Sequence, residues 1–141
     1  MLSASVLTQY PSVDIAAVQA LLEDEVKKDK HKIVVLDDDP TGVQTVHDIA
    51  VYTDWSYESI KKGFEGEDKL FYVLTNSRGF TVEQTTKAHL EIGETVAKVA
   101  AEMGMEYVIV SRGDSTLRGH YPLETELLRQ MAEKHGDRKV D

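Results

Sequence analysis

The 141-residue sequence contains no cysteine, only three prolines and few aromatic residues (7%). Without cysteine, neither a disulfide framework nor a thiolate metal centre is possible. No apolar run approaches the roughly 20 residues that a membrane-spanning helix needs. The first residues also lack the basic flank and apolar core of a secretory signal. We therefore expect a cytoplasmic protein that does not bind membranes.

Nucleotide and metal motifs are missing as well. The sequence has neither a GxxxxGK[ST] loop nor a GxGxxG pattern after a strand, so no nucleotide site is visible. Its five histidines are scattered without ligand spacing, and we predict no metal site. The net charge of −9 disfavours contact with nucleic acid. An anionic small molecule would need a locally basic pocket on this acidic chain.

The apolar pattern predicts alternating strands and helices. Short apolar runs typical of strands lie at 33–36, 49–53, 70–74 and 107–110. Helical periodicity and capping signals occur at 12–29, 56–63, 82–103 and 122–135. This order predicts a three-layer α/β fold with a mostly parallel sheet flanked by helices. The direction of the strand at 49–53 stays open, because the connection before it is too short for a comfortable crossover helix.

We expect residues 1–31 to form a helical extension and residues 32–141 to form the α/β domain. The sequence stops where the strand–helix pattern calls for a further strand, so we interpret the α/β domain as incomplete at its C-terminal end. An incomplete sheet exposes a strand edge. We therefore expect self-association through that edge.

Three of the predicted strands end in chemically dense turns, at 37–42, 75–79 and 111–120. Ligands of parallel α/β sheets bind at the carboxyl ends of the strands, where such turns gather. Guanidinium groups suit carboxylate or phosphate, and glycines let backbone N–H groups approach a ligand closely. An aspartate beside a hydroxyl also serves as general base for attack on a phosphoryl group. The combination predicts a site for a small polyhydroxylated acid.

The turns also resemble a known family. Leu36–Thr45, Thr75–Arg78 and Asp114–His120 are similar to the N-terminal domain of the four-carbon acid sugar kinases, which have a DD-x-TG turn and a more specific DSTLRG turn. The resemblance covers about residues 32–130 and departs from the family at Pro40 and His120.

The resemblance implies a two-domain kinase that uses ATP and Mg²⁺ to phosphorylate sugar acids of the tetronate or 3-oxo-tetronate type. Its N-terminal domain binds the sugar acid and its C-terminal domain binds ATP. The present chain alone is then expected to bind the small sugar acid without phosphorylating it, and to carry no cofactor.

The turn chemistry and the resemblance together give a set of candidate site residues. The catalytic candidates are Asp38 and Asp39. The substrate-binding candidates are Thr41, Gly42, Gln44, Asn76, Ser77, Arg78, Arg112, Asp114, Ser115, Thr116, Arg118, Gly119 and His120.

Two alternatives remain open. The segment from Asp37 to Thr41 matches the DxDxT pattern of haloacid-dehalogenase-like phosphatases, in which Asp37 would be the nucleophile beside Mg²⁺. Against it, Asp114 has no acidic companion nearby and no lysine follows an equivalent strand. The second alternative is a non-catalytic module that binds a small anion.

Overall fold

The computed structural model describes the chain apart from residues 1–3, 115, 117, 137–138 and 141. It divides into two compact units, residues 1–30 and 31–141, which we describe separately. The first unit holds a 3₁₀ turn, η1 (Ala4–Gln9), and helix α1 (Ile15–Lys28). Helix α1 begins later than the sequence pattern predicted, because the Asp14 carboxylate caps it by accepting the Ala17 N–H at 3.0 Å. Every residue of α1 is exposed.

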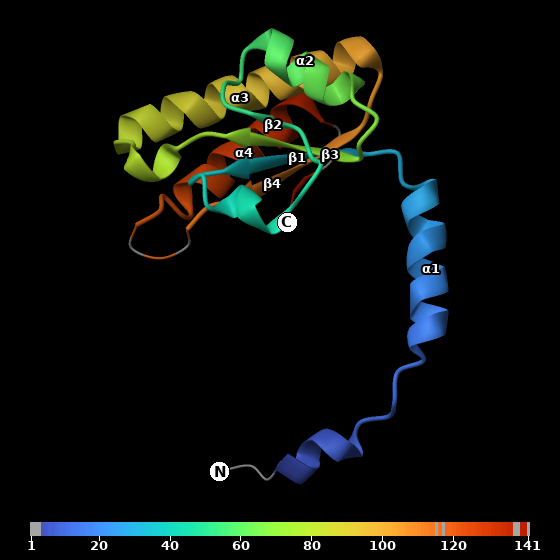
Figure 1. Ribbon diagram of the computed structural model, residues 1–141. Coiled ribbons are helices and arrows are strands. Elements are labelled where there is room, and N and C mark those ends of the chain that lie inside the picture. The colour runs from blue at the N-terminus through green and yellow to red at the C-terminus, as the bar shows by residue number, and fades with distance from the viewer. Residues whose placement is uncertain (1–3, 115, 117, 137–138, 141) are drawn as a thin grey trace. The chain divides into compact units, whose positions relative to one another are not determined.

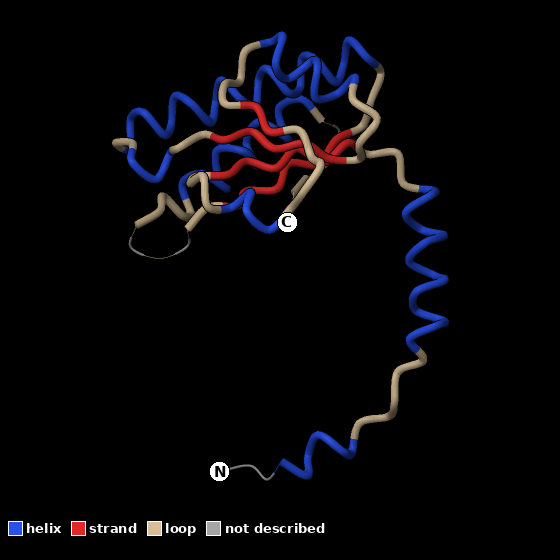
Figure 2. Tube along the Cα trace, viewed as in Figure 1, coloured by secondary structure: helices blue, strands red, loops and turns tan. Residues whose placement is uncertain are grey.

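The second unit is built on a four-stranded sheet with the order β2-β3-β1-β4. The strands are β1 (Lys32–Asp37), β2 (Val51–Tyr52), β3 (Leu70–Leu74) and β4 (Tyr107–Arg112), drawn in red in Figure 2. All three pairings are parallel. The sequence left the direction of β2 open. Strand β2 runs parallel to β3, its partner in the sheet.

The helices of this unit begin and end near the signals read from the sequence, except that the helix predicted to end at Gly63 continues to Glu65. They are α2 (Tyr57–Glu65), α3 (Val82–Met103) and α4 (Leu123–His135). Ser56 caps α2, a reciprocal capping box of Thr81 and Gln84 opens α3, and Gly104 closes α3 in the left-handed region with φ 63°. Within the described ranges, no helix is long and apolar enough to cross a membrane.

One face of the sheet carries the hydrophobic core. Side chains alternate between the two faces of a strand, and Val34 and Leu36 of β1 stand in register with Phe71 and Val73 of β3. These four side chains are at most 2% exposed. They form one cluster with side chains of the helices: Ile60 and Phe64 of α2, Ile92, Val96, Val99 and Ala100 of α3, and Leu128 of α4.

A different connection lies on the other face of the sheet. The crossovers through α2 and α3 step across the sheet in one direction, whereas the β1–β2 connection steps in the opposite direction. Right-handed crossovers in opposite directions lie on opposite faces. The β1–β2 connection contains the short 3₁₀ turn η2 (Gly42–Thr45), which Figure 1 shows on the side of the sheet away from α2 and α3. The predicted three-layer α/β class is confirmed.

Gly63 of α2 gives a test of this packing. A Cβ atom at Gly63 would lie 2.6 Å from the Phe71 ring, and Phe71 is itself held edge-on between Tyr52 and Phe64. We expect Gly63→Ala to lower the free energy of unfolding by about 1–3 kcal/mol, as overpacking does, in urea denaturation. Gly79→Ala is the control, because a Cβ there meets no described atom within 4 Å. Equal stability of the two variants would contradict the proposed packing.

Candidate functional site

The three predicted turns meet at the carboxyl edge of the sheet. Strands β3, β1 and β4 are neighbours, and their last residues Leu74, Asp37 and Arg112 stand in register. The turns that follow these residues therefore start side by side. We call the resulting polar surface, made by residues 37–42, 75–79, 112–114, 116 and 118–120, the rim.

Asp38 joins all three turns. Its side chain is 3% exposed and receives a bidentate contact from Arg78, with Nε–Oδ2 at 3.1 Å and Nη2–Oδ1 at 2.8 Å. The Asp114 backbone N–H donates to the same carboxylate at 3.0 Å. The backbone repeats both links, since the Arg78 N–H donates to the Asp38 carbonyl and the Asp38 N–H to the Arg112 carbonyl. Asp38 thus fixes the spacing of the rim from inside.

Asp39 and Asp114 organise matching turns. Each lies two residues before a threonine, and each carboxylate accepts both the backbone N–H and the hydroxyl of that threonine, Thr41 or Thr116. These hydrogen bonds lower the pKa of both carboxyls. Nearby guanidinium groups lower the two pKa values further. Both groups therefore stay ionised as hydrogen-bond acceptors at neutral pH.

Three arginines lie beside these carboxylates and differ in how far their side chains are exposed. Arg78 also pairs with Asp39, with Nη1 3.1 Å from Oδ2, and its side chain is 23% exposed. Arg118 pairs with Asp114 at 2.8 Å, but its side chain is 71% exposed. Arg112 lies 3.5 Å from Asp37 and is 43% exposed. Arg78 is committed to the frame of the rim, whereas Arg112 and Arg118 remain accessible to an anion.

Asp37 is the unusual member of the aspartate run. It is fully buried, and among the described residues neither of its oxygens has a hydrogen-bond partner. The backbone at Gly42 covers it so closely that a Cβ there would lie 1.8 Å from Oδ2. Burial raises the pKa of the Asp37 carboxyl, and the Arg112 guanidinium opposes the rise only in part.

The remaining predicted residues lie at different depths. Ser77 is buried and its hydroxyl donates inward to Glu124 at 2.7 Å. Gly119 packs on the Asp114 carbonyl, where a Cβ would lie at 1.7 Å. Ser115 falls outside the described residues. Among the remaining candidates, the exposed ones are Thr41, Gln44, Asn76 and Thr116, and His120 is half-buried.

Sequence reasoning missed two buried polar residues behind the rim, Glu124 of α4 and His89 of α3. The sequence pattern did contain a signal that both residues are buried. Glu124 is spaced three and four residues before Leu127 and Leu128, on the apolar face of α4, and His89 lies on the apolar face of α3. A polar side chain on a buried helical face needs a partner, and here the two lie together.

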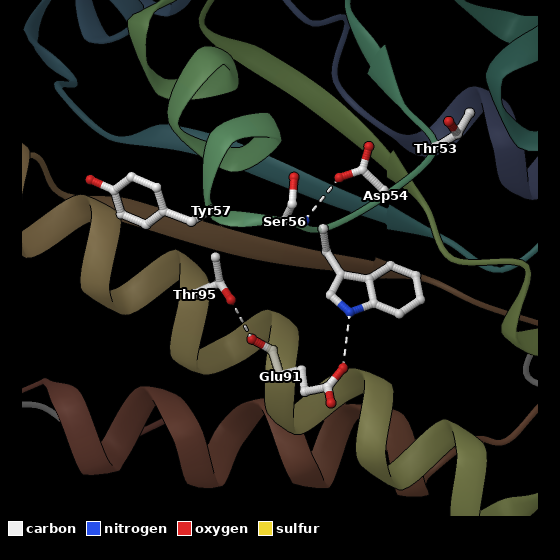
Figure 3. A pocket seen from close by; sticks show the side chains of 7 residues that line it. Thr53, Asp54, Ser56, Tyr57, Glu91 and Thr95 are labelled. Carbon is white, nitrogen blue, oxygen red and sulfur yellow. Dashed lines mark hydrogen bonds between the residues drawn. The ribbon is translucent and has the colours of Figure 1, made fainter.

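A groove of about 480 Å³ lies beside α2 and α3, lined by the residues that follow β2 and by Glu91 and Thr95 of α3 (Figure 3). Several of its polar groups bond to one another. Trp55 donates to the Glu91 carboxylate, the Thr95 hydroxyl donates to the Glu91 carbonyl, and Asp54 accepts the Ser56 N–H. These contacts account for the groove as local structure, and we assign it no ligand.

The comparisons with known proteins agree with this geometry. The model of the family described as the sugar-binding N-terminal domain matches residues 33–137. The chain belongs to this family. The match confirms the resemblance to the N-terminal domain of the four-carbon acid sugar kinases that was identified from the turns. No curated protein and no solved structure matches the chain.

Asp37 gives a pH-dependent prediction. Because its pKa is raised above the ordinary 3.8 in the folded state, its stabilising contribution is complete below pH 3.8 and is lost as pH rises through the folded-state pKa. We expect Asp37→Asn to be more stable than the wild type at pH 7, because the amide fills the same space without burying a charge. Urea denaturation from pH 3.5 to 7 should show this difference shrinking toward the acidic end.

Asp39→Asn is the matched control, with the opposite sign. The pKa of Asp39 is lowered, so its charged form stabilises the fold at pH 7 and its loss should reduce stability there. If both variants shift stability in the same direction, the assigned environments of the two carboxyls are wrong.

Proposed function

We propose that this sugar-binding domain binds a four-carbon sugar acid, of the tetronate or 3-oxo-tetronate type, as the substrate-binding part of an ATP-dependent kinase. The observation that carries the proposal is the convergence of both family turns on Asp38, through Arg78 and the Asp114 N–H. It creates a local group of three arginines on a chain whose net charge is −9. The rim also holds four aspartates, so its net charge does not attract an anion, and the exposed guanidinium groups of Arg112 and Arg118 would have to bind it.

The accessible groups of the rim divide between the two ends of such a ligand. Arg112 and Arg118 have exposed guanidinium groups that suit the carboxylate. Asp39 and Asp114, whose pKa values are lowered, accept hydrogen bonds from hydroxyl groups. Asn76 is exposed and adds an amide. This arrangement recognises a hydroxylated acid better than a simple inorganic anion.

Of the two proposed catalytic aspartates, Asp39 is placed better to meet the reacting hydroxyl. Both oxygens of Asp38 are engaged by Arg78, and its side chain is 3% exposed. The Asp39 side chain is 24% exposed. Phosphoryl transfer needs an oriented acceptor more than a strong base, so the lowered pKa of Asp39 is compatible with this role. We propose that Asp38 orients the turns of the rim and that Asp39 contacts the reacting hydroxyl group.

We propose that ATP and Mg²⁺ bind mainly to another part of the kinase. The described residues contain no group of three or more His, Asp or Glu side chains arranged to hold a metal ion. Asp38, Asp39 and Asp114 already accept hydrogen bonds from neighbouring residues of the chain. The domain alone is expected to bind the sugar acid without phosphorylating it. We propose a cytoplasmic location.

The phosphatase alternative finds less support. It requires the Asp37 carboxylate to attack a phosphorus atom, yet this carboxylate is fully buried beneath Gly42. Hydrolysis of a generic phosphomonoester in the presence of Mg²⁺ would restore this alternative. Binding of inorganic anions with no preference for sugar acids would favour the small-anion module instead.

Arg118 tests the proposed ligand. Isothermal titration of the stereoisomeric tetronates (2,3,4-trihydroxybutanoates) should detect binding to the wild type. Arg118→Ala should weaken it by about 2 kcal/mol, the worth of a charge-assisted hydrogen bond. Arg129→Ala is the control, because Arg129 pairs with Glu126 and Glu133 on α4. Unchanged affinity would remove Arg118 from the site, and a wild type that binds no tetronate would refute the sugar-acid proposal.

We also propose self-association through β4. This strand is at one end of the sheet, and Val108 and Val110 on it are 47% and 43% exposed. An exposed apolar edge strand favours pairing with a second copy. Light scattering should give a mass above that of one chain, and Val108→Lys should lower it by charging the edge. A monomeric wild type at micromolar concentration would contradict this.

A further inference from the structure

Glu124 is a carboxylate buried where an apolar side chain would be expected. It lies in the first turn of α4, is 2% exposed, and shares its helix face with the buried Leu127 and Leu128. The Ser77 hydroxyl donates to its Oε1 at 2.7 Å. His89 Nε2 lies 3.5 Å from the same oxygen. Burying a carboxylate is costly even when it is partnered, so packing alone does not account for Glu124.

The second oxygen of Glu124 reaches another turn of the rim. A Cβ atom at Gly113 would lie 2.6 Å from Oε2, so the backbone of this glycine packs directly on the carboxylate. Gly113 stands between Arg112 and Asp114, and Ser77 immediately precedes Arg78. One buried side chain therefore contacts the turns after β3 and β4, each beside residues proposed to hold or frame the ligand.

The contact extends to the third turn through hydroxyl groups. Thr75 Oγ1 lies 3.1 Å from Ser77 Oγ and 3.0 Å from the carbonyl oxygen of Asp37. All of these groups are buried. On the other side, His89 is anchored to its own helix, with Nδ1 2.9 Å from the Thr85 carbonyl oxygen. A continuous polar chain thus runs from α3 and α4 to the end of β1.

We propose that Glu124 is a positioning residue for the sugar-acid site. By holding Ser77 on one side and Gly113 on the other, it sets the distance between Arg78 and the turn that carries Asp114 and Arg118. The inference rests on the proposed function for its ligand and on the geometry alone for its mechanical part. Hydrogen bonds between buried groups restrict the arrangement of the elements they join, and here they join α4 to the turns of the rim.

The experiment compares Glu124→Gln with Glu126→Gln, a matched control on the same helix whose carboxylate pairs with Arg129. The first readout needs no ligand. It is the NMR signal of the Arg78 Nε–H, the group that donates to Asp38. We expect Glu124→Gln and Ser77→Ala to shift this signal and speed its exchange with solvent, and Glu126→Gln to leave it unchanged.

The second readout is tetronate affinity by isothermal titration. Glu124→Gln and Ser77→Ala should each weaken binding about tenfold. The double variant should be no weaker than either single one, because both break the same link. Glu126→Gln should bind like the wild type. Ser77→Ala also covers the case in which Glu124→Gln fails to fold, since it removes only one hydroxyl.

The outcomes separate the two proposals. If the wild type binds no tetronate, the proposed function is wrong, and the Arg78 signal still decides whether Glu124 holds the turn. An Arg78 signal that is unchanged in both Glu124→Gln and Ser77→Ala overturns the inference. Folded Glu124→Gln with wild-type affinity, in a protein whose wild type binds, overturns it as well.

Discussion

The bidentate pair of Arg78 and Asp38 is the contact on which the site depends. It links turns that are 40 residues apart in the sequence, and the Asp114 N–H adds the third turn to the same carboxylate. Because Asp38 is almost fully buried, losing Arg78 would leave an unpaired charge inside the protein, which costs far more than losing a surface ion pair.

Two turns of the rim share the same local hydrogen-bond pattern. Asp39 and Asp114 each bind the hydroxyl and N–H of the threonine two residues later, and each also meets an arginine. Such turns form from their own sequence and need little help from the rest of the chain. The long-range contacts made by Asp38 bring these preformed pieces together. Local geometry fixes each piece and tertiary contact fixes their distance.

This division explains what the sequence could predict. Strand ends, caps and turns depend on neighbouring residues, so β3, the box at Thr81 and Gln84, and the stop at Gly104 follow from the pattern. That parallel strands gather their turns at one edge follows from topology. Which residue each buried aspartate pairs with does not follow from the sequence pattern. Nothing in the run of three aspartates distinguishes Asp38, whose carboxylate is fully paired, from Asp37, whose buried carboxylate has no hydrogen-bond partner among the described residues.

Two carboxyl groups, those of Glu124 and Asp37, are buried directly behind the rim. Both carboxylates are buried next to it, and neither adds to the hydrophobic core. Both carboxyl groups are held at fixed positions behind the surface, Glu124 by Ser77 and Asp37 beside Arg112. Arg112 and Arg118 then face outward from a frame whose acids are already fixed. In the proposed function, a ligand carboxylate would meet guanidinium groups whose backbone positions are already set, and preorganisation of this kind lowers the entropic cost of binding.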